Sequence, residues 1–176
     1  MDLRRARPDE YDAIGALTVA AYEPFLLGPD DDYRTRLTDV AGRDRDAEVW
    51  VAAEDGPSGV VVLGNVTLCP PGSPWCELAR DGEGEFRMLA VAPAAQGRGV
   101  GAALAGLVVD RFRAEGARGV VLSSLTGMAG AHRLYERLGF TRAAARDWSP
   151  VPGVDLVAYE LDLGREPRTD QRTEHP

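Results

Sequence analysis

The residues with the clearest chemical meaning lie in a glycine-rich segment near the middle of the chain. An apolar stretch at residues 89–91 is followed by Pro93 and then by the segment Gln96-Gly97-Arg98-Gly99-Val100-Gly101-Ala102. Glycine has no Cβ, so the backbone of such a loop can curl and come close to a ligand. The first N–H groups of a helix have no partner within it, and the helix dipole adds positive charge there. A strand, a glycine-rich loop and a helix start in this order predict a phosphate-binding site.

The same loop also fits a dinucleotide-binding fingerprint, because Gly97, Gly99 and Ala102 have the spacing G-x-G-x-x-A. In that fold an acidic residue ends the next strand and holds the ribose. Here the next predicted strand ends in Leu122-Ser123-Ser124, and the chain has no lysine for a Walker-type loop. A dinucleotide-dependent oxidoreductase is therefore a distant alternative.

A second motif follows about thirty residues later, with the sequence Ala131-His132-Arg133-Leu134-Tyr135-Glu136-Arg137-Leu138-Gly139-Phe140. Together with the loop, which matches Q/R-x-x-G-x-G/A, it makes the chain resemble the GNAT superfamily of acyl-CoA-dependent N-acetyltransferases over residues 49–163. The resemblance implies an α+β fold, with a mixed, mostly antiparallel sheet that is flanked by about four helices. The sheet is expected to split like a V between the strands at residues 85–91 and 120–124. The resemblance also implies acetyl-CoA as co-substrate. No metal is expected, and the protein is expected in the cytoplasm.

The resemblance assigns cofactor binding to the strand and the glycine-rich loop. The pantetheine arm is expected in the split, beside the backbone of Leu89, Ala90 and Val91. The backbone N–H of Leu89 or Val91 is the candidate oxyanion donor. The loop N–H groups are expected to hold the pyrophosphate, and Arg98 can add a charge-assisted hydrogen bond. The expected loop contacts are Gln96, Gly97, Arg98, Gly99, Val100, Gly101 and Ala102.

Two side chains are the candidate catalytic groups. Tyr135 is the candidate general acid, because the matching tyrosine of the family lies beside the coenzyme sulfur. A phenol held in contact with a thiolate can protonate it or donate a hydrogen bond to it. Glu85 is the candidate general base, acting through water, since many family members carry a glutamate at the start of this strand. Glu83 shares the strand parity of Glu85 and stays open as an alternative.

One position departs from the family pattern. Family members often have asparagine where this chain has Met128, so the usual asparagine contact with the pantetheine arm is not expected, and Met128 is expected to pack instead. Ser123, Ser124 and Thr126 end a predicted strand near the cleft, where they either contact acceptor or cofactor or serve only as turn residues. His132 is expected on the surface of its helix.

The function implied by the resemblance is transfer of an acetyl group from acetyl-CoA to a primary amine by direct attack in a ternary complex. The acceptor is expected to be a small-molecule amine or a peptide N-terminus. It would enter between Tyr22 and Tyr33, where Phe25, Leu26 and the acids at residues 30–32 shape its site. A non-catalytic acyl-CoA-binding sensor or regulatory module is the alternative function, and a homodimer is a further expectation from the family.

Composition narrows the class of protein. The chain has 176 residues, of which 44% are hydrophobic and 27% are charged, as in globular domains. The formal net charge of −8 argues against nucleic-acid binding, and no apolar run is long enough to span a bilayer. Cys69 and Cys76 match no common zinc-site spacing and are expected as free thiols. We expect one domain over residues 1–163 and a disordered, polar tail over residues 164–176.

Hydrophobic periodicity and turn residues predict the elements that position these groups. Asp9 is the predicted N-cap of the first helix, and Gly139 follows the last one. Residues 42–46 are predicted to form a charged turn and residues 70–84 a long loop. Helices are predicted at residues 9–22, 30–41, 99–115 and 128–138, and strands at residues 3–6, 49–53, 59–68, 85–91, 120–124, 140–146 and 156–163.

Overall fold

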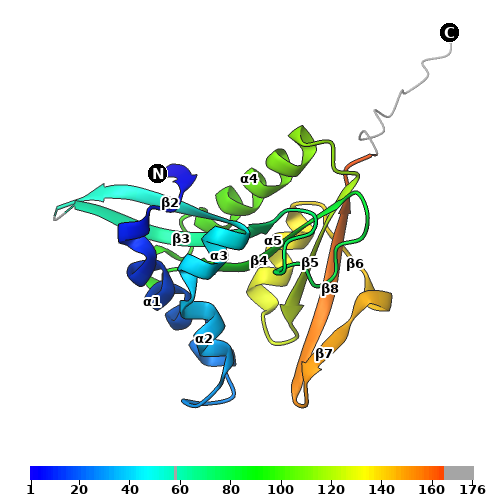
Figure 1. Cartoon of the computed structure of the whole chain (residues 1–176), viewed down its shortest axis with the longest axis horizontal. Coiled ribbons are helices and arrows are strands. Elements are labelled where there is room, and N and C mark those ends of the chain that lie inside the picture. The colour runs from blue at the N-terminus through cyan, green and yellow to red at the C-terminus, as the bar shows by residue number, and fades with distance from the viewer. Residues whose placement is uncertain (58, 165–176) are drawn as a thin grey trace, which may run out of the picture.

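The central feature of the fold is one mixed sheet of eight strands, seen in a computed structural model that describes residues 1–57 and 59–164 (Figure 1). The strand order is β1-β2-β3-β4-β5-β8-β6, and β7 pairs with β8. Neighbouring strands run antiparallel except for β4 and β5, which run parallel. The strands are β1 (Asp2–Arg5), β2 (Glu48–Gly56), β3 (Gly59–Cys69), β4 (Glu83–Val91), β5 (Gly119–Leu125), β6 (Thr141–Arg142), β7 (Trp148–Val151) and β8 (Val154–Asp162).

The sheet is split between β4 and β5, as predicted. Only residues 83–85 of β4 pair with residues 119–121 of β5, and the two strands diverge beyond that point (Figure 1). A bulge in β4 accompanies the split, because the pairing with β3 shifts register between Asn65 and Thr67. Met88 at this bulge has a positive φ of 52°, which is uncommon for a residue with a side chain. The split leaves one edge of β4 without a neighbouring strand among the described residues.

Five α-helices of the described residues flank the sheet, where about four were expected. The helices are α1 (Tyr11–Tyr22), α2 (Tyr33–Thr38), α3 (Val40–Asp46), α4 (Val100–Ala114) and α5 (Ala129–Arg137), and 3-10 turns lie at Pro8–Glu10, Glu23–Phe25, Pro93–Ala95 and Ala144–Arg146. Alternation along β2 sends Val49 and Val51 into a cluster with Ile14 and Val40, whereas Ala52 joins the cluster that contains Leu104. Helices α1 and α3 therefore cover one face of the β1–β4 half of the sheet, and α4 covers the opposite face.

The prediction of one helix and a charged turn between α1 and β2 is wrong. The chain instead forms α2 and α3, which meet at Asp39. Asp39 Oδ1 accepts a hydrogen bond from Gly42 N (2.9 Å) and so caps α3. Arg43, assigned to the turn because of its charge, is fully buried. Its guanidinium donates to Thr67 Oγ1 (3.0 Å) and to the Leu37 carbonyl (2.9 Å), so hydrogen bonds offset its burial.

Smaller corrections concern the first helix cap and the last strands. Asp9 lies inside a 3-10 turn rather than at the N-cap of α1, and the Glu10 carboxylate accepts the Arg7 N–H (2.9 Å) instead. The strand predicted at residues 140–146 is limited to β6, because the Asp147 carboxylate takes the Ala158 N–H (2.9 Å) that a longer strand would have paired. The residues of β7 were predicted to form only the connection between the last two strands, but they pair with β8. The predicted tail from residue 165 onward lies outside the described residues.

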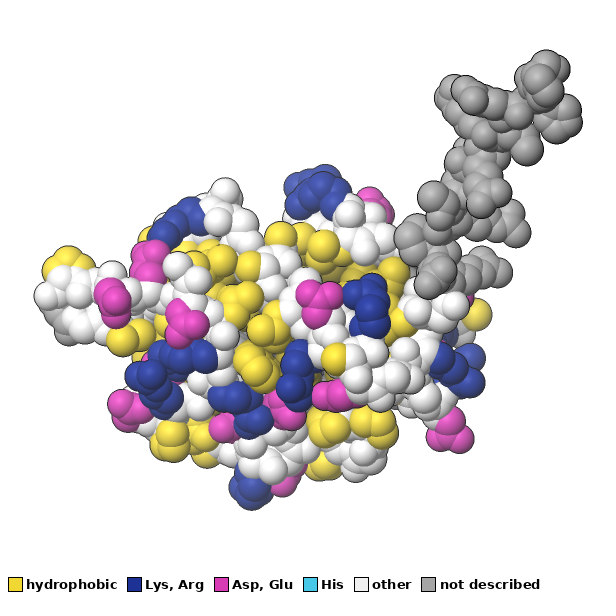
Figure 2. Space-filling view, turned by 90° about the horizontal axis from the view of Figure 1, so that it is seen from above, with side chains coloured by type: hydrophobic (Ala, Val, Ile, Leu, Met, Phe, Trp, Pro, Cys, Tyr) yellow, Lys and Arg dark blue, Asp and Glu magenta, His cyan; other side chains and the backbone are white. Residues whose placement is uncertain are grey.

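The surface carries charges of both signs. On the face shown in Figure 2, arginine side chains are interspersed with acidic ones, and hydrophobic side chains are exposed between them. Cys69 and Cys76 are free thiols, as predicted. Within residues 1–57 and 59–164, no helix has the length and apolar character needed to cross a membrane.

Candidate active site

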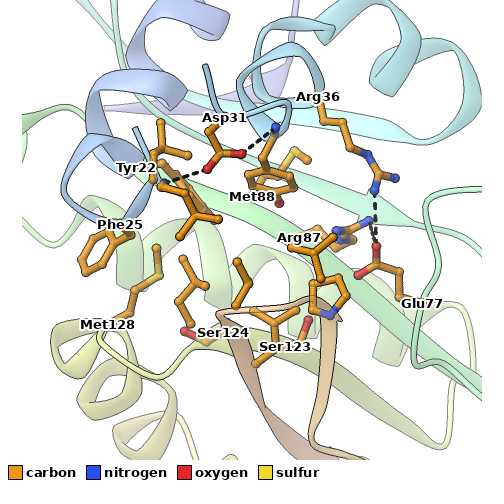
Figure 3. A pocket seen from close by; sticks show the side chains of 18 of the residues that line it. Tyr22, Phe25, Asp31, Arg36, Glu77, Arg87, Met88, Ser123, Ser124 and Met128 are labelled. Atoms are coloured by element: carbon orange, nitrogen blue, oxygen red, sulfur yellow. Dashed lines mark hydrogen bonds and ion pairs between the residues drawn. The ribbon is translucent and has the colours of Figure 1, made fainter. Parts of the chain in front are cut away.

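A cavity of about 630 Å³ lies where β4 and β5 diverge (Figure 3). Its walls come from the segment between α1 and α2, the middle of β4, the end of β5, the first turns of α5 and the β7–β8 hairpin. The α1–α2 segment and the β7–β8 hairpin therefore face each other across the opening of the split (Figure 1). Many of the lining side chains are apolar, among them Tyr22, Phe25, Leu26, Met88, Leu122 and Leu125.

Tyr135 enters this cavity from α5. Its ring packs edge-on against Phe86, with ring centroids 5.9 Å apart, and only 5% of the residue is exposed. Burial raises the pKa of its hydroxyl, so the phenol stays protonated at neutral pH. No described residue forms a hydrogen bond with that hydroxyl. Its proton is therefore available to a group bound in the cavity.

The glycine-rich loop joins β4 to α4 through the turn Pro93–Ala95. Gly97 and Gly99 have left-handed φ angles of 76° and 80°, and a Cβ at either position would meet nothing within 4 Å. Gly99 is the N-cap of α4, and no side chain of residues 1–57 or 59–164 caps the helix. The N–H groups of Val100, Gly101 and Ala102 find no acceptor among the described residues. The start of α4 therefore keeps its free donors and is open to a large ligand.

The predicted cofactor residues of β4 lie beside this helix start. Val91 pairs with Gly64 and Ala90 with Asn65 on the β3 side, while Leu89 lines the cavity. A Cβ added to Gly101 would lie 3.5 Å from Val91 and 3.9 Å from Leu89. The structure thus brings Leu89, Ala90 and Val91 together with the loop.

Arg98 and Gln96 are the two long polar side chains of the glycine-rich loop. Arg98 forms a bidentate ion pair with Glu54, at 3.1 Å and 2.7 Å, on the exposed surface. A phosphate bound at the loop would share the Arg98 guanidinium with Glu54, or would take the place of Glu54 as its partner. Gln96 precedes the two left-handed glycines and has an extended backbone, which directs the chain into the loop.

Glu85 does not line the cavity. Its side chain is fully buried, and its Oε2 accepts the N–H groups of Glu77 (2.9 Å), Leu78 (2.8 Å) and Ala79 (2.9 Å). Glu83 lies outside the cavity as well and pairs with Arg146 (2.8 Å). Burial opposes ionisation of Glu83, but the hydrogen bonds from Arg146 and from the Arg80 N–H, together with the charges of both arginines, outweigh it and lower the pKa of Glu83. Neither candidate base faces the place where an acceptor would bind.

Among the described residues, Glu77 is the one glutamate that lines the cavity, and it was not predicted from the sequence. Its Oε1 lies 2.8 Å from Arg87 Nη1 and 3.8 Å from Arg36 Nη1, and these three side chains cluster at one end of the cavity (Figure 3). Burial raises the pKa of the Glu77 carboxyl, although both arginines act in the opposite direction. The residue sits in a loop without periodicity, so no pattern in the sequence indicated which way its side chain points.

The residues expected on the acceptor side lie where they were predicted, but one of the acids is already hydrogen-bonded. Tyr22, Phe25, Leu26, Tyr33 and the acids at residues 30–32 all line the cavity, but the Asp31 carboxylate is occupied by the N–H groups of Leu27 (2.8 Å) and Tyr33 (2.9 Å).

On the opposite wall, Ser123, Ser124 and Met128 line the cavity, and Thr126 does not. His132 Nε2 lies 3.1 Å from the Leu125 carbonyl, and its ring packs against Tyr159. Among the described residues, no cluster of three or more His, Cys, Asp or Glu side chains could hold a metal ion.

Comparison with known proteins places this site in a family. The model of the acetyltransferase (GNAT) family matches residues 12–140. A mycothiol acetyltransferase from Beutenbergia cavernae is 33% identical over 104 residues, which are 59% of this chain and 32% of that protein. The chain therefore spans about a third of the length of this relative.

Two solved structures share the fold. A protein from Salmonella typhimurium, solved with its cofactor acetyl-CoA, is 26% identical with a TM-score of 0.66, and 97% of this chain and 98% of that one are covered. A GNAT family acetyltransferase from Brucella melitensis in complex with acetyl-CoA is 28% identical with a TM-score of 0.58, and 92% and 89% are covered. Because the family model spans both motifs and the two strands of the split, the chain belongs to the GNAT family of acetyltransferases.

Proposed function

We propose that the protein transfers an acetyl group from acetyl-CoA to a primary amine by direct attack in a ternary complex. The observation that carries this proposal is the cavity in the split sheet, into which Tyr135 presents a hydroxyl without a partner among the described residues. The free N–H groups at the start of α4 and the open edge of β4 adjoin the same split. The likeness to structures that contain acetyl-CoA supports this choice of co-substrate.

The chain offers the groups that a coenzyme of this kind needs. A diphosphate requires several convergent donors, and the N–H groups of Val100, Gly101 and Ala102 are free to provide them. The Gln96-Gly97-Arg98-Gly99 segment directly precedes these N–H groups and would lie beside the same diphosphate. The backbone of Leu89, Ala90 and Val91 would pair with the pantetheine arm as a neighbouring strand does, since no described strand covers that edge.

Acyl transfer also requires polarisation of the thioester carbonyl and protonation of the departing thiolate. The N–H of Leu89 or Val91 would donate to the carbonyl oxygen, and such a donor is worth about 3 kcal/mol at the transition state. Tyr135 would donate its proton to the thiolate as the C–S bond breaks. Its raised pKa keeps that proton in place until negative charge develops on the sulfur.

Thiol release from acetyl-CoA with a broad panel of amines tests this function. We expect Tyr135→Phe to lower kcat by about 10²–10⁴-fold with little change in the Kd for acetyl-CoA. Tyr11→Phe is the matched control, because the Tyr11 hydroxyl bonds Asp44 (2.6 Å) and does not line the cavity. Unchanged activity in Tyr135→Phe would remove the acid role. Binding of acetyl-CoA without thiol release for any amine would favour a sensor module instead.

A further inference from the structure

Three side chains that line the cavity each have a buried polar atom without a hydrogen-bond partner among the described residues. These atoms are Glu77 Oε2, Ser124 Oγ and Trp148 Nε1. Native proteins leave few buried polar atoms unpaired, so each one points to a partner that the chain itself does not supply. Of the three groups, only the Glu77 carboxylate is an anion that can bind a cationic group and accept a proton from it.

The surroundings of Glu77 favour proton transfer. It lies across the cavity from Phe25 and Met128 (Figure 3). Arg87 of β4 and Arg36 of α2 occupy its Oε1 side, and they leave Oε2 unpaired.

Two further titratable groups face this carboxylate, Tyr33 of α2 and Glu85 of β4. The two arginines favour the neutral form of an amine bound beside Glu77, and burial favours the protonated form of the carboxyl itself. The arginines also favour the ionised form of Glu77, but burial outweighs them there, so the net effect helps a proton to pass from an ammonium group to Glu77.

The loop that carries Glu77 is fixed in place by Glu85. Three successive N–H groups, those of Glu77, Leu78 and Ala79, converge on Glu85 Oε2 at 2.8–2.9 Å. Arg146 adds a hydrogen bond to the Leu78 carbonyl from the other side. Hydrogen bonds to a buried carboxylate are strong, so they hold the Glu77 backbone at one position relative to β4.

We propose that Glu77 binds the amino group of the acceptor and removes its proton, and that Glu85 is a positioning residue that acts through the loop. This inference rests on the acetyl transfer proposed above. It assigns the role of base to the carboxylate that faces the cavity, and it gives Glu85 a role that its buried position allows.

The proposed transfer returns Tyr135 and Glu77 to their starting protonation states. An ammonium acceptor gives one proton to Glu77 Oε2, and the lone pair left on nitrogen forms the new C–N bond at the thioester carbonyl. The carbonyl electrons move to oxygen and return when the C–S bond breaks. The departing thiolate takes the Tyr135 proton, and Tyr135 recovers a proton from the nitrogen of the new amide. Glu77 finally releases its proton to water.

The pH dependence of kcat/KM, measured by thiol release, tests this assignment. In the wild type, activity should rise with pH as Glu77 ionises. Glu77→Gln should remove that rise and lower kcat/KM near neutral pH by about 10²–10⁴-fold. The remaining activity of this variant should increase only at the higher pH at which the amine loses its proton in solution. Glu85→Gln should lower kcat but keep the rise, and the exposed-surface control Glu115→Gln should match the wild type.

Each outcome bears on one of the two proposals. An unchanged pH profile in Glu77→Gln, with an active wild type, would overturn the role of Glu77 and leave acetyl transfer intact. A wild type that releases no thiol with any amine would overturn both. Acetyl-CoA binding by calorimetry verifies that each variant is folded. If Glu77→Gln fails to fold because Arg87 loses its partner, Glu77→Gln/Arg87→Gln replaces it in the same assay.

Discussion

Gly84 lies where the two halves of the sheet are joined, and a side chain at this position would disturb the junction. It pairs with Val120, and an added Cβ would come within 2.5 Å of Phe112 Cε1 and closer still to two other ring atoms. Ordinary contacts of a Cβ are 3.4–4 Å, so the ring must move by about 1 Å. Phe112 is only 2% exposed and packs in the main core, which leaves it little room.

The expected cost of Gly84→Ala follows from this overlap. Overpacking of a core costs about 1–3 kcal/mol, which corresponds to a drop in Tm of about 2–12 °C for a chain of this size. Urea unfolding monitored by circular dichroism measures the free energy directly. Gly106→Ala in α4 is the matched control, because a Cβ there meets nothing within 4 Å and should raise stability by about 0.5–1 kcal/mol.

A double-mutant cycle makes the argument refutable. Phe112→Leu shortens the side chain that Gly84→Ala would strike, so the double variant should be more stable than the sum of the two single changes predicts. The expected coupling is about 1 kcal/mol. Additive effects, or a Gly84→Ala variant as stable as the wild type, would show that the junction tolerates a side chain and that the reasoning fails.

Four further predictions follow from other parts of the molecule. Gly99→Ala should weaken acetyl-CoA binding by calorimetry, since its left-handed backbone costs about 1–2 kcal/mol with a side chain present. Arg43→Ala should lower the free energy of unfolding in urea by about 2–5 kcal/mol, because it empties a buried site and strands the Leu37 carbonyl. The hydrogen bond from Arg4 lowers the pKa of Glu10 below its usual 4.5. The stability that Glu10 adds is therefore present above pH 4.5 and is lost as pH falls through the lowered pKa, so urea midpoints of wild type and Glu10→Gln should converge at acid pH. Phenethylamine should show a higher kcat/KM than ethanolamine in the thiol-release assay, because Tyr22, Phe25 and Met128 make an apolar wall.

The sequence was most informative where one local pattern determines the structure. Residues 96–102 require left-handed glycines before a helix, and the backbone angles of Gly97 and Gly99 meet that requirement. The split between β4 and β5 was also expected correctly, although only through family resemblance. A split depends on how far two strands pair, which alternation along either strand does not encode.

The sequence was least informative where a charged side chain is buried. Arg43 was predicted in a charged turn and Glu85 as a base at the cleft, yet each is fully buried and hydrogen-bonded to main-chain groups of another segment. Glu77 lies in a loop whose course is set by those same bonds, so its direction could not follow from local pattern. Glu85 was chosen over Glu83 from the family resemblance, and their shared strand parity left both open, because parity says which face a residue occupies but not whether that face is open.

Because β4 and β5 pair only at residues 83–85, any rotation of one half of the sheet against the other would pivot at this junction. From Glu85 to the end of β4 the strand extends for six residues, or about 20 Å at roughly 3.3 Å per residue. A rotation of only about 5° at the pivot would therefore displace the far end of that arm by nearly 2 Å, by simple lever geometry. Small changes in packing near Gly84 and Phe112 would be amplified at the opposite end, so residues remote from the opening can tune its width.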